Sequence, residues 1–174
     1  MSSKQEKIKK FYQDLKDIRY GWHDRNNTLH KHLSDGNFKK EYKMQKISKI
    51  KESNHAICWE MCELERQFFK QEKIHHKVIF ALLQGNKKFP CHTFLIYEDN
   101  GKWYWFEASW DKKKGIHEYA SLVALLDYIR NNFYDFVKSE YDPQKIIFYE
   151  YKKPFKRMGC NLFYFHCMHG RKIR

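Results

Sequence analysis

Residues 91–107 read Cys91-His-Thr-Phe-Leu-Ile-Tyr-Glu-Asp-Asn100-Gly101-Lys-Trp-Tyr-Trp-Phe-Glu107, and this stretch predicts a β-hairpin. Two runs rich in aromatic and β-branched residues, 92–99 and 102–109, flank the Asn-Gly pair. Both central residues of a type I′ turn need a positive φ, which Asn and Gly tolerate best, so Asn-Gly between such runs is a strong hairpin signal. The chain is therefore expected to build an antiparallel sheet around this hairpin.

The two-residue turn also fixes how the strands pair, and Leu95 is expected opposite Phe106. Side chains alternate between the faces of a sheet, so this register places His92 and Glu107 on the same face as diagonal neighbours. Their Cα atoms would be about 7–8 Å apart, which lets a carboxylate reach an imidazole nitrogen. A slip of one residue would separate them, so the pair depends on the turn type.

A cysteine precedes the clearest helix-forming run in the first half of the chain. Cys58 is followed by residues 59–69, which contain no Gly or Pro, and Ser53 and Asn54 are expected to cap this helix. A thiolate in the first turn is stabilised by the helix dipole, and the free N–H groups there can form an oxyanion hole. Cys62, one turn deeper, is interpreted as a core residue. The alternative for Cys58 is a buried structural thiol.

Taken together, Ala56-Ile57-Cys58-Trp59-Glu60, His92-Thr93-Phe94-Leu95 and Trp103-Tyr104-Trp105-Phe106-Glu107 resemble the core of the transglutaminase-like superfamily of papain-fold proteins. The longer stretches 18–22, 106–110 and 115–119 are similar to small bacterial and phage transglutaminase-like proteins. The chain departs from the superfamily pattern at two positions. Ala56 stands where a glycine is usual, and Glu107 stands where an aspartate is usual.

This resemblance implies an α+β fold with a papain-like, transglutaminase-like core, in which N-terminal helices and a Cys-bearing helix pack on an antiparallel sheet. It implies covalent catalysis by a triad of Cys58, His92 and Glu107 on an amide of a protein or peptide, by hydrolysis or by transfer to an amine. No cofactor or metal is expected. Residues near the nucleophile, namely Tyr20, Trp22 and Trp59, are the candidates for oxyanion or substrate contacts.

Aromatic residues supply 18% of the chain, and the five tryptophans lie in or beside the site segments. Aromatic walls suit an extended or apolar substrate segment laid across a shallow groove. Part of this set is expected in the core instead.

Composition limits the other possibilities. The 174 residues predict a single domain, 1–174, large enough for a real core. Five cysteines without a framework spacing predict reduced thiols in a cytoplasm, and neither a membrane-length apolar span nor a secretory signal is evident. The net charge of +13 favours an acidic partner, such as nucleic acid, an anionic membrane surface or an acidic protein. A merely solvated basic surface is the alternative.

The remaining pattern predicts helices over residues 3–18, 38–51 and 121–137 and strands over 77–84, 145–151 and 161–166. Loops are expected at Tyr20-Gly21-Trp22, Asp35-Gly36-Asn37 and 85–88.

Two further groups of residues could bear on function. The tail residues Cys160, His166, Cys167 and His169 have a spacing that no common zinc finger uses, so a metal site there is disfavoured. The pair His75-His76 is interpreted as a solvated loop. The competing class to an enzyme is a non-catalytic module that keeps this fold and binds an acidic protein or nucleic acid. Thiol reactivity separates the two classes, since a catalytic site has one fast thiol.

Overall fold

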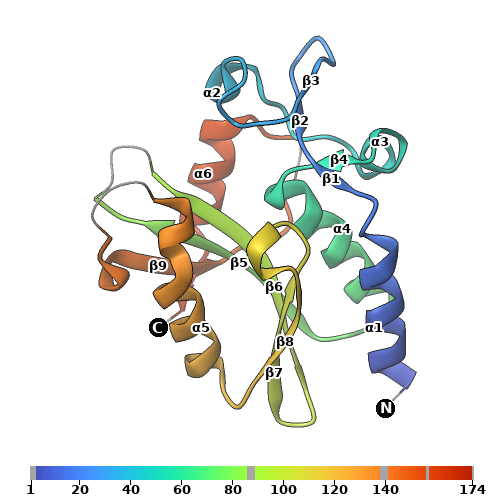
Figure 1. Ribbon diagram of the computed structural model, residues 1–174, viewed down its shortest axis with the longest axis vertical. Helices are drawn as coiled ribbons and strands as arrows, with labels where there is room; N and C mark the ends of the chain where they lie inside the picture. The colour runs from blue at the N-terminus through green and yellow to red at the C-terminus, as the bar shows by residue number, and fades with distance from the viewer. Residues whose placement is uncertain (1–2, 86–88, 138–140, 156, 174) are drawn as a thin grey trace.

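The fold centres on a six-stranded antiparallel sheet in the order β10-β9-β5-β6-β7-β8 (Figure 1). The computed structural model describes residues 3–85, 89–137, 141–155 and 157–173. The strands of the sheet are β5 (His76–Leu83), β6 (Cys91–Asp99), β7 (Lys102–Glu107), β8 (Gly115–Tyr119), β9 (Ile146–Glu150) and β10 (Arg171–Ile173). Short pairs flank the sheet, made by β1 (Arg19–Tyr20) with β4 (His55–Ala56) and by β2 (Trp22–His23) with β3 (Leu29–His30).

The predicted hairpin is confirmed. Asn100 and Gly101 both have positive φ, 51° and 73°, as a type I′ turn requires. The pairing of β6 with β7 runs from the turn to Leu95 opposite Phe106, which is the predicted register.

Helices cover the two faces of this sheet. The helices are α1 (Ser3–Asp14), α2 (Phe38–Glu41), α3 (Ile47–Ser53), α4 (Cys58–Gln71), α5 (Leu122–Asn132) and α6 (Cys160–Met168). On β5, alternate residues divide between two hydrophobic clusters, with Phe80 in the cluster of α4 and Ile79 in the cluster of α5. The helices α4 and α5 therefore lie on opposite faces, as Figure 1 also shows.

The strand prediction for 161–166 is wrong, because these residues belong to α6. Cys160, Phe163 and Cys167 are the buried residues of α6, at a spacing that places them on one side of a helix. Three consecutive aromatic residues at 163–165 favour a strand locally, and tertiary packing overrides that preference. The strand of this region comes later, as β10.

The single helix predicted over 38–51 is also wrong, since α2 and α3 are separate. Between them the chain is extended: the Met44 N–H donates to the Met158 carbonyl, and the Gln45 N–H donates to the carboxylate of Glu60. These bonds to distant segments replace the helical ones.

The entry to α4 differs from the prediction as well. Asn54 ends α3 in a left-handed conformation, with φ 53°, so Ser53 and Asn54 do not cap α4. Residue Ile57 occupies the N-cap position, and Cys58 is the first helical residue. The expected loop at Tyr20-Gly21-Trp22 is instead the junction of two short strands, β1 and β2, and Tyr20 pairs in parallel with Ala56 of β4.

Other predicted elements hold with small changes. The first helix ends at Asp14, and the helix predicted over 121–137 becomes α5 followed by a 3-10 turn, Phe133–Phe136. His76 opens β5 and packs against Phe69, so it is not part of a solvated loop. Most of the expected loop at 85–88 lies outside the described residues. Among the described residues, none of the helices is long and apolar enough for a membrane crossing.

Candidate active site

Cys58 opens α4 because a buried carboxylate holds the helix start in place. Glu60, in the first turn, accepts a hydrogen bond from the Ile57 N–H at 3.2 Å. Its other oxygen accepts from the Tyr42 hydroxyl at 3.1 Å and from the Gln45 N–H at 2.8 Å. Glu60 thus ties the helix to the extended segment between α2 and α3. Burial outweighs these bonds and raises the pKa of Glu60 to about 7.

His92 and Glu107 form a buried pair, as the hairpin register predicts. The His92 Nε2 atom lies 2.7 Å from Glu107 Oε2, and both side chains are almost fully buried. The second carboxylate oxygen, Oε1, accepts from the Ser109 N–H, the Ser109 hydroxyl and the Trp110 N–H. With these bonds the carboxylate is fixed in one orientation, and it fixes the imidazole in turn.

The charges of this pair stabilise each other. Burial alone lowers the pKa of His92, but the charge of Glu107 and hydrogen bonds to Cys58 and Glu107 raise it to about 10. Burial raises the pKa of Glu107. The charge and the hydrogen bond of His92, together with the two backbone N–H donors, outweigh burial and lower the pKa of Glu107. At neutral pH the pair is therefore an imidazolium and a carboxylate.

The Cys58 thiol lies beside this imidazole: both line one cavity, and the thiol contributes to the raised pKa of His92. The three predicted triad residues are thus brought together, from the start of α4, the start of β6 and the end of β7. Cys62, by contrast, is buried in the core as predicted, where desolvation raises the pKa of its thiol well above the usual range.

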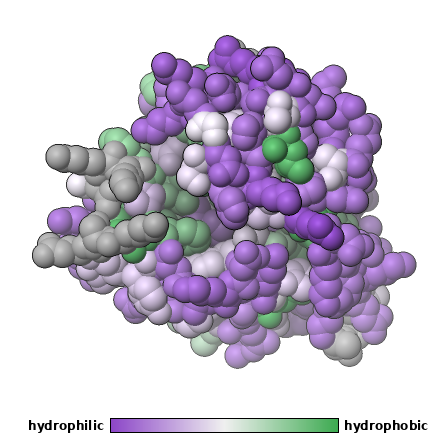
Figure 2. Space-filling model, turned by 45° about the horizontal axis from the view of Figure 1, so that its top comes forward, coloured by the Kyte–Doolittle hydropathy of each residue, from purple (hydrophilic) through white to green (hydrophobic). Residues whose placement is uncertain are grey.

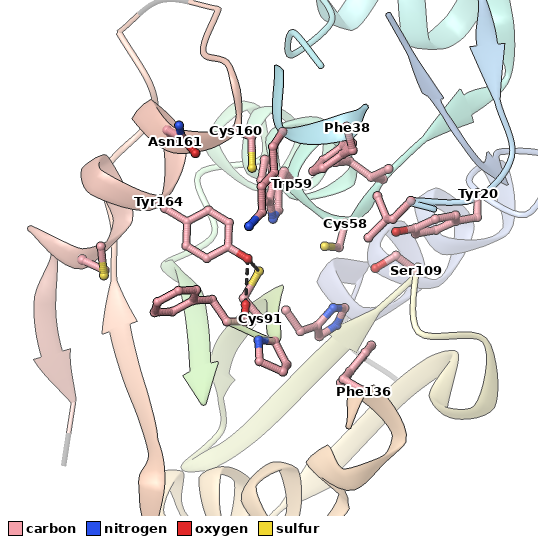
Figure 3. A pocket seen from close by; sticks show the side chains of 17 residues that line it. Tyr20, Phe38, Cys58, Trp59, Cys91, Ser109, Phe136, Cys160, Asn161 and Tyr164 are labelled. Atoms are coloured by element: carbon pink, nitrogen blue, oxygen red, sulfur yellow. Dashed lines mark hydrogen bonds between the residues drawn. The ribbon is translucent and has the colours of Figure 1, made fainter. Parts of the chain in front are cut away.

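A cavity of about 500 Å³ opens onto Cys58 and His92 (Figure 3). Its walls are mainly apolar and aromatic, with Trp59 from α4, Phe38 from α2 and Phe136 from the 3-10 turn after α5. In Figure 3 the Cys58 sulfur and the Tyr20 and Ser109 hydroxyls lie around the same space. Figure 2 shows a hollow with apolar side chains inside a hydrophilic rim.

Sequence reasoning missed one wall of this cavity. The Cys91 thiol and the Tyr164 hydroxyl are joined by a hydrogen bond of 2.8 Å, and Tyr164 also donates to the Phe89 carbonyl. Cys91 therefore donates to Tyr164. Tyr164, Asn161 and Cys160 reach the cavity because they share one side of α6. Their spacing of three to four residues was the available signal, and it was hidden by the strand interpretation.

Two of the three predicted oxyanion or substrate candidates line the cavity, and the third does not. Tyr20 and Trp59 line the cavity, and burial with the neighbouring Cys58 raises the pKa of Tyr20, so its hydroxyl stays protonated. Trp22 does not line it: its ring is fully buried, stacks on His30, and its indole N–H donates to the His32 carbonyl. Trp22 is therefore corrected to a core residue, because its ring packs among His30, Phe38 and Tyr42.

The wider set of tryptophans divides between core and cavity, and part of it was expected in the core. Trp105 and Trp110 are buried beside α5, and Trp103 packs at the margin of the same cluster. Only Trp59 of the five lines the cavity within the described part of the chain. Its ring stacks on Phe163 with centroids 4.3 Å apart, which fixes the wall between α4 and α6.

The tail cluster does not gather into one site. Cys160 and Cys167 are buried, whereas His166 bonds to the Lys152 carbonyl and His169 to the Phe165 carbonyl. Over the described ranges, no group of three or more His, Cys, Asp or Glu side chains is arranged to hold a metal ion.

Comparisons of the chain with known protein families, with curated proteins and with solved structures find no match. The site is therefore defined by its own geometry. A thiol at a helix start lies beside a buried imidazole that a carboxylate orients, and both line an aromatic cavity. This arrangement has the parts that nucleophilic acyl transfer needs.

Proposed function

We propose that this protein is a cysteine-dependent acyl-transfer enzyme, a hydrolase or a transferase, with the papain-like core of the transglutaminase-like superfamily. Its substrate is an amide of a protein or peptide. The observation that carries the proposal is the buried His92, which bonds Glu107 through Nε2 at 2.7 Å and lines one cavity with the Cys58 thiol, which contributes to its raised pKa. A structural thiol would not need an oriented, charged imidazole.

The chemistry follows from these groups. The Cys58 thiolate attacks the amide carbonyl carbon, and the carbonyl electrons move onto its oxygen. When the tetrahedral intermediate collapses, His92 gives its proton to the leaving amine and the C–N bond breaks. Glu107 keeps the imidazole oriented and stabilises its positive form. The remaining thioester is released to water or to a second amine, with His92 as the base.

The developing oxyanion has two proposed donors. The N–H of Cys58, at the first position of α4, has no acceptor one turn earlier and points out of the helix start. The Tyr20 hydroxyl is protonated and shares the cavity with the thiol. Donors placed before the reaction begins stabilise the transition state without reorganisation.

The cavity supports an apolar or aromatic group on the acyl side of the amide. Phe38, Trp59 and Phe136 wall it, and apolar walls of this kind exclude water from a thioester. All five cysteines are unpaired in the structure, including Cys58, which must be unpaired to act as a nucleophile. Unpaired thiols are typical of a reducing cytoplasm, and this is the proposed location.

The test is to trap the acyl-enzyme. The protein is incubated with a cell extract and quenched in acid, and the adduct on Cys58 is identified by mass spectrometry. A peptide or protein acyl group on Cys58, absent from Cys58→Ala and present in Cys62→Ala, is the expected result. An acetyl or other small acyl group would contradict the peptide substrate. No adduct, with a slow Cys58 thiol, would favour the non-catalytic binding module.

A further inference from the structure

A second, polar cavity of about 640 Å³ lies on the far side of the wall that bounds the catalytic cavity. Consecutive residues divide between the two. Gly159 lines the polar cavity and the next residue, Cys160, the catalytic one. Likewise Lys39, in α2, lines the catalytic cavity, and Lys43, just after α2, lines the polar one. The wall between the cavities is therefore the junction of α2 with the start of α6.

The polar cavity is strongly basic. The cations that line it are all exposed and come from three separate segments: Arg25 after β2, Lys43, Lys46 and Lys49 around the start of α3, and Arg157 before α6. Figure 2 shows hydrophilic side chains over most of this end of the molecule. Lys49 also pairs with Glu52 at 2.6 Å, but both side chains are exposed and such pairs are weak.

The one carboxylate among the lining residues is already engaged. Asp24 accepts from the Asn26 and Thr28 N–H groups through Oδ1, and its Oδ2 lies 3.2 Å from Nε2 of His30. It shapes the turn after β2, and its single negative charge is outnumbered by the five cations that line the cavity. Burial and the nearby His55 lower the pKa of His23, so that ring adds no charge at neutral pH.

The shape and the lining residues favour a flexible polypeptide over nucleic acid. Single strands bind where exposed aromatic rings stack on bases, and the aromatic lining here is the buried Tyr42 with the half-buried His23. A duplex is too wide to enter a concave cavity of this volume. An extended segment that carries Asp or Glu side chains fits both the concavity and the charge.

We propose that this basic cavity binds an acidic segment of the polypeptide substrate, close to the amide that reacts at Cys58. The proposal rests on the proposed function, because it gives the substrate two features: an apolar group for the catalytic cavity and acidic residues for the basic one. Cations at such a site raise the association rate as well as the affinity, and salt weakens both.

The test measures binding without chemistry. The Cys58→Ala protein is titrated into two fluorescein-labelled peptides of equal length, one alternating Glu with Gly and the other Gln with Gly, and anisotropy is recorded. The acidic peptide is expected to bind at least about tenfold tighter, with an affinity that falls steeply with salt. The double variant K43E/K46E is expected to lose about tenfold or more of that affinity. The milder K43Q/K46Q guards against a folding defect and should lose less.

The control variant is K10E/K70E, which makes the same change in net charge at exposed positions outside the cavity. Its affinity for the acidic peptide should be nearly that of the Cys58→Ala protein without further substitutions. Equal binding of both peptides, or an equal loss in K43E/K46E and K10E/K70E, would overturn the proposal. Tighter binding of a single-stranded oligonucleotide at the same charge would assign the cavity to nucleic acid. Because the binding test uses Cys58→Ala throughout, its failure does not bear on catalysis, which the trapped acyl-enzyme measures separately.

Discussion

The helices α4 and α5 cover opposite faces of one sheet, and the residues that they bury differ in polarity. The buried residues of α5 are Leu125, Leu126 and Ile129. Those of α4 include Cys58 and the carboxyl groups Glu60, Glu63 and Glu65. Burying a carboxyl group costs free energy unless partners compensate for the lost water. The helix α5 is a hydrophobic cover, whereas α4 gives up stability to place polar groups.

The partners of these carboxyl groups differ. Glu60 bonds Ile57 and the segment between α2 and α3, and Glu63 pairs with Arg66 at 3.2 Å. Burial and the nearby Glu107 raise the pKa of Glu65 well above the usual range, and within the described residues Oε2 of Glu65, like Oε2 of Glu63, has no hydrogen-bond partner. The contrast predicts that the buried residues of α4 contribute pH dependence to stability and that those of α5 do not.

The largest expected effect is at Glu107. Glu107→Ala leaves a buried imidazole without its counter-charge and should cost about 3–5 kcal/mol of unfolding free energy, measured by urea denaturation. Glu107→Gln keeps the acceptor oxygen and should cost less. In both variants the pKa of His92, followed by NMR, should fall. Glu118→Ala, which removes an exposed partner of Lys102, should change stability by about 1 kcal/mol or less. An unchanged His92 pKa in Glu107→Gln would contradict the ion pair.

A cavity created by a substitution in α5 should lower the unfolding free energy without changing the titration of the catalytic site. Leu126 is 2% exposed, so Leu126→Ala should lose about 2–5 kcal/mol of unfolding free energy. The shape of the stability–pH curve should stay as it is, because no titrating group is removed. Val123→Ala, on the exposed side of the same helix, serves as the matched control and should be nearly neutral. A changed pH profile in Leu126→Ala would break the contrast between the helices.

Glu60 tests the α4 half of the comparison, because its buried carboxyl group should make stability depend on pH. Folding raises its pKa from 4.5 to about 7, so between these pH values the unfolded chain releases the proton before the folded chain does. The unfolding free energy should therefore fall as the pH rises through this window, by about 1.4 kcal/mol for each unit of pKa difference. Glu60→Gln should flatten this part of the curve, as measured by urea denaturation at several pH values. An equally steep fall in the variant would assign it to other groups.

The smallest expected effect is at the turn. Gly101 has φ 73° and open space where a Cβ would be, so Gly101→Ala should cost about 1–2 kcal/mol through backbone strain alone. Thermal unfolding measures the loss. Gly101→Asn should cost less, because Asn tolerates this conformation. A loss of the His92–Glu107 contact in either variant would mean that the turn, rather than the buried pair, holds the register.

The parts of the structure that were predicted depend on local chemistry. The Asn100-Gly101 turn needs positive φ at both positions, and that local requirement fixed the register that brings His92 to Glu107. The helix start at Cys58 was placed to within its first turn, although its cap was misassigned.

The parts that were missed depend on contacts between distant segments. The break between α2 and α3 follows from hydrogen bonds to Glu60 and Met158, which no local pattern contains. The α6 wall was hidden for a related reason: Phe163 and its aromatic neighbours have strand preference, and only packing against Trp59 selects the helix. Trp22 could not be separated from Trp59 by composition, since both are large aromatic residues near the nucleophile.

The central claim is that Cys58, His92 and Glu107 act as one site, and thiol alkylation tests it most directly. The protein is treated with a limiting amount of iodoacetamide near neutral pH, and the rate at each of the five cysteines is followed by mass spectrometry of peptides. Cys58 should react at least about tenfold faster than Cys62, Cys91, Cys160 and Cys167, and His92→Ala should remove that advantage. Equal rates at all five thiols, or a fast Cys58 that His92→Ala leaves unchanged, would contradict the account.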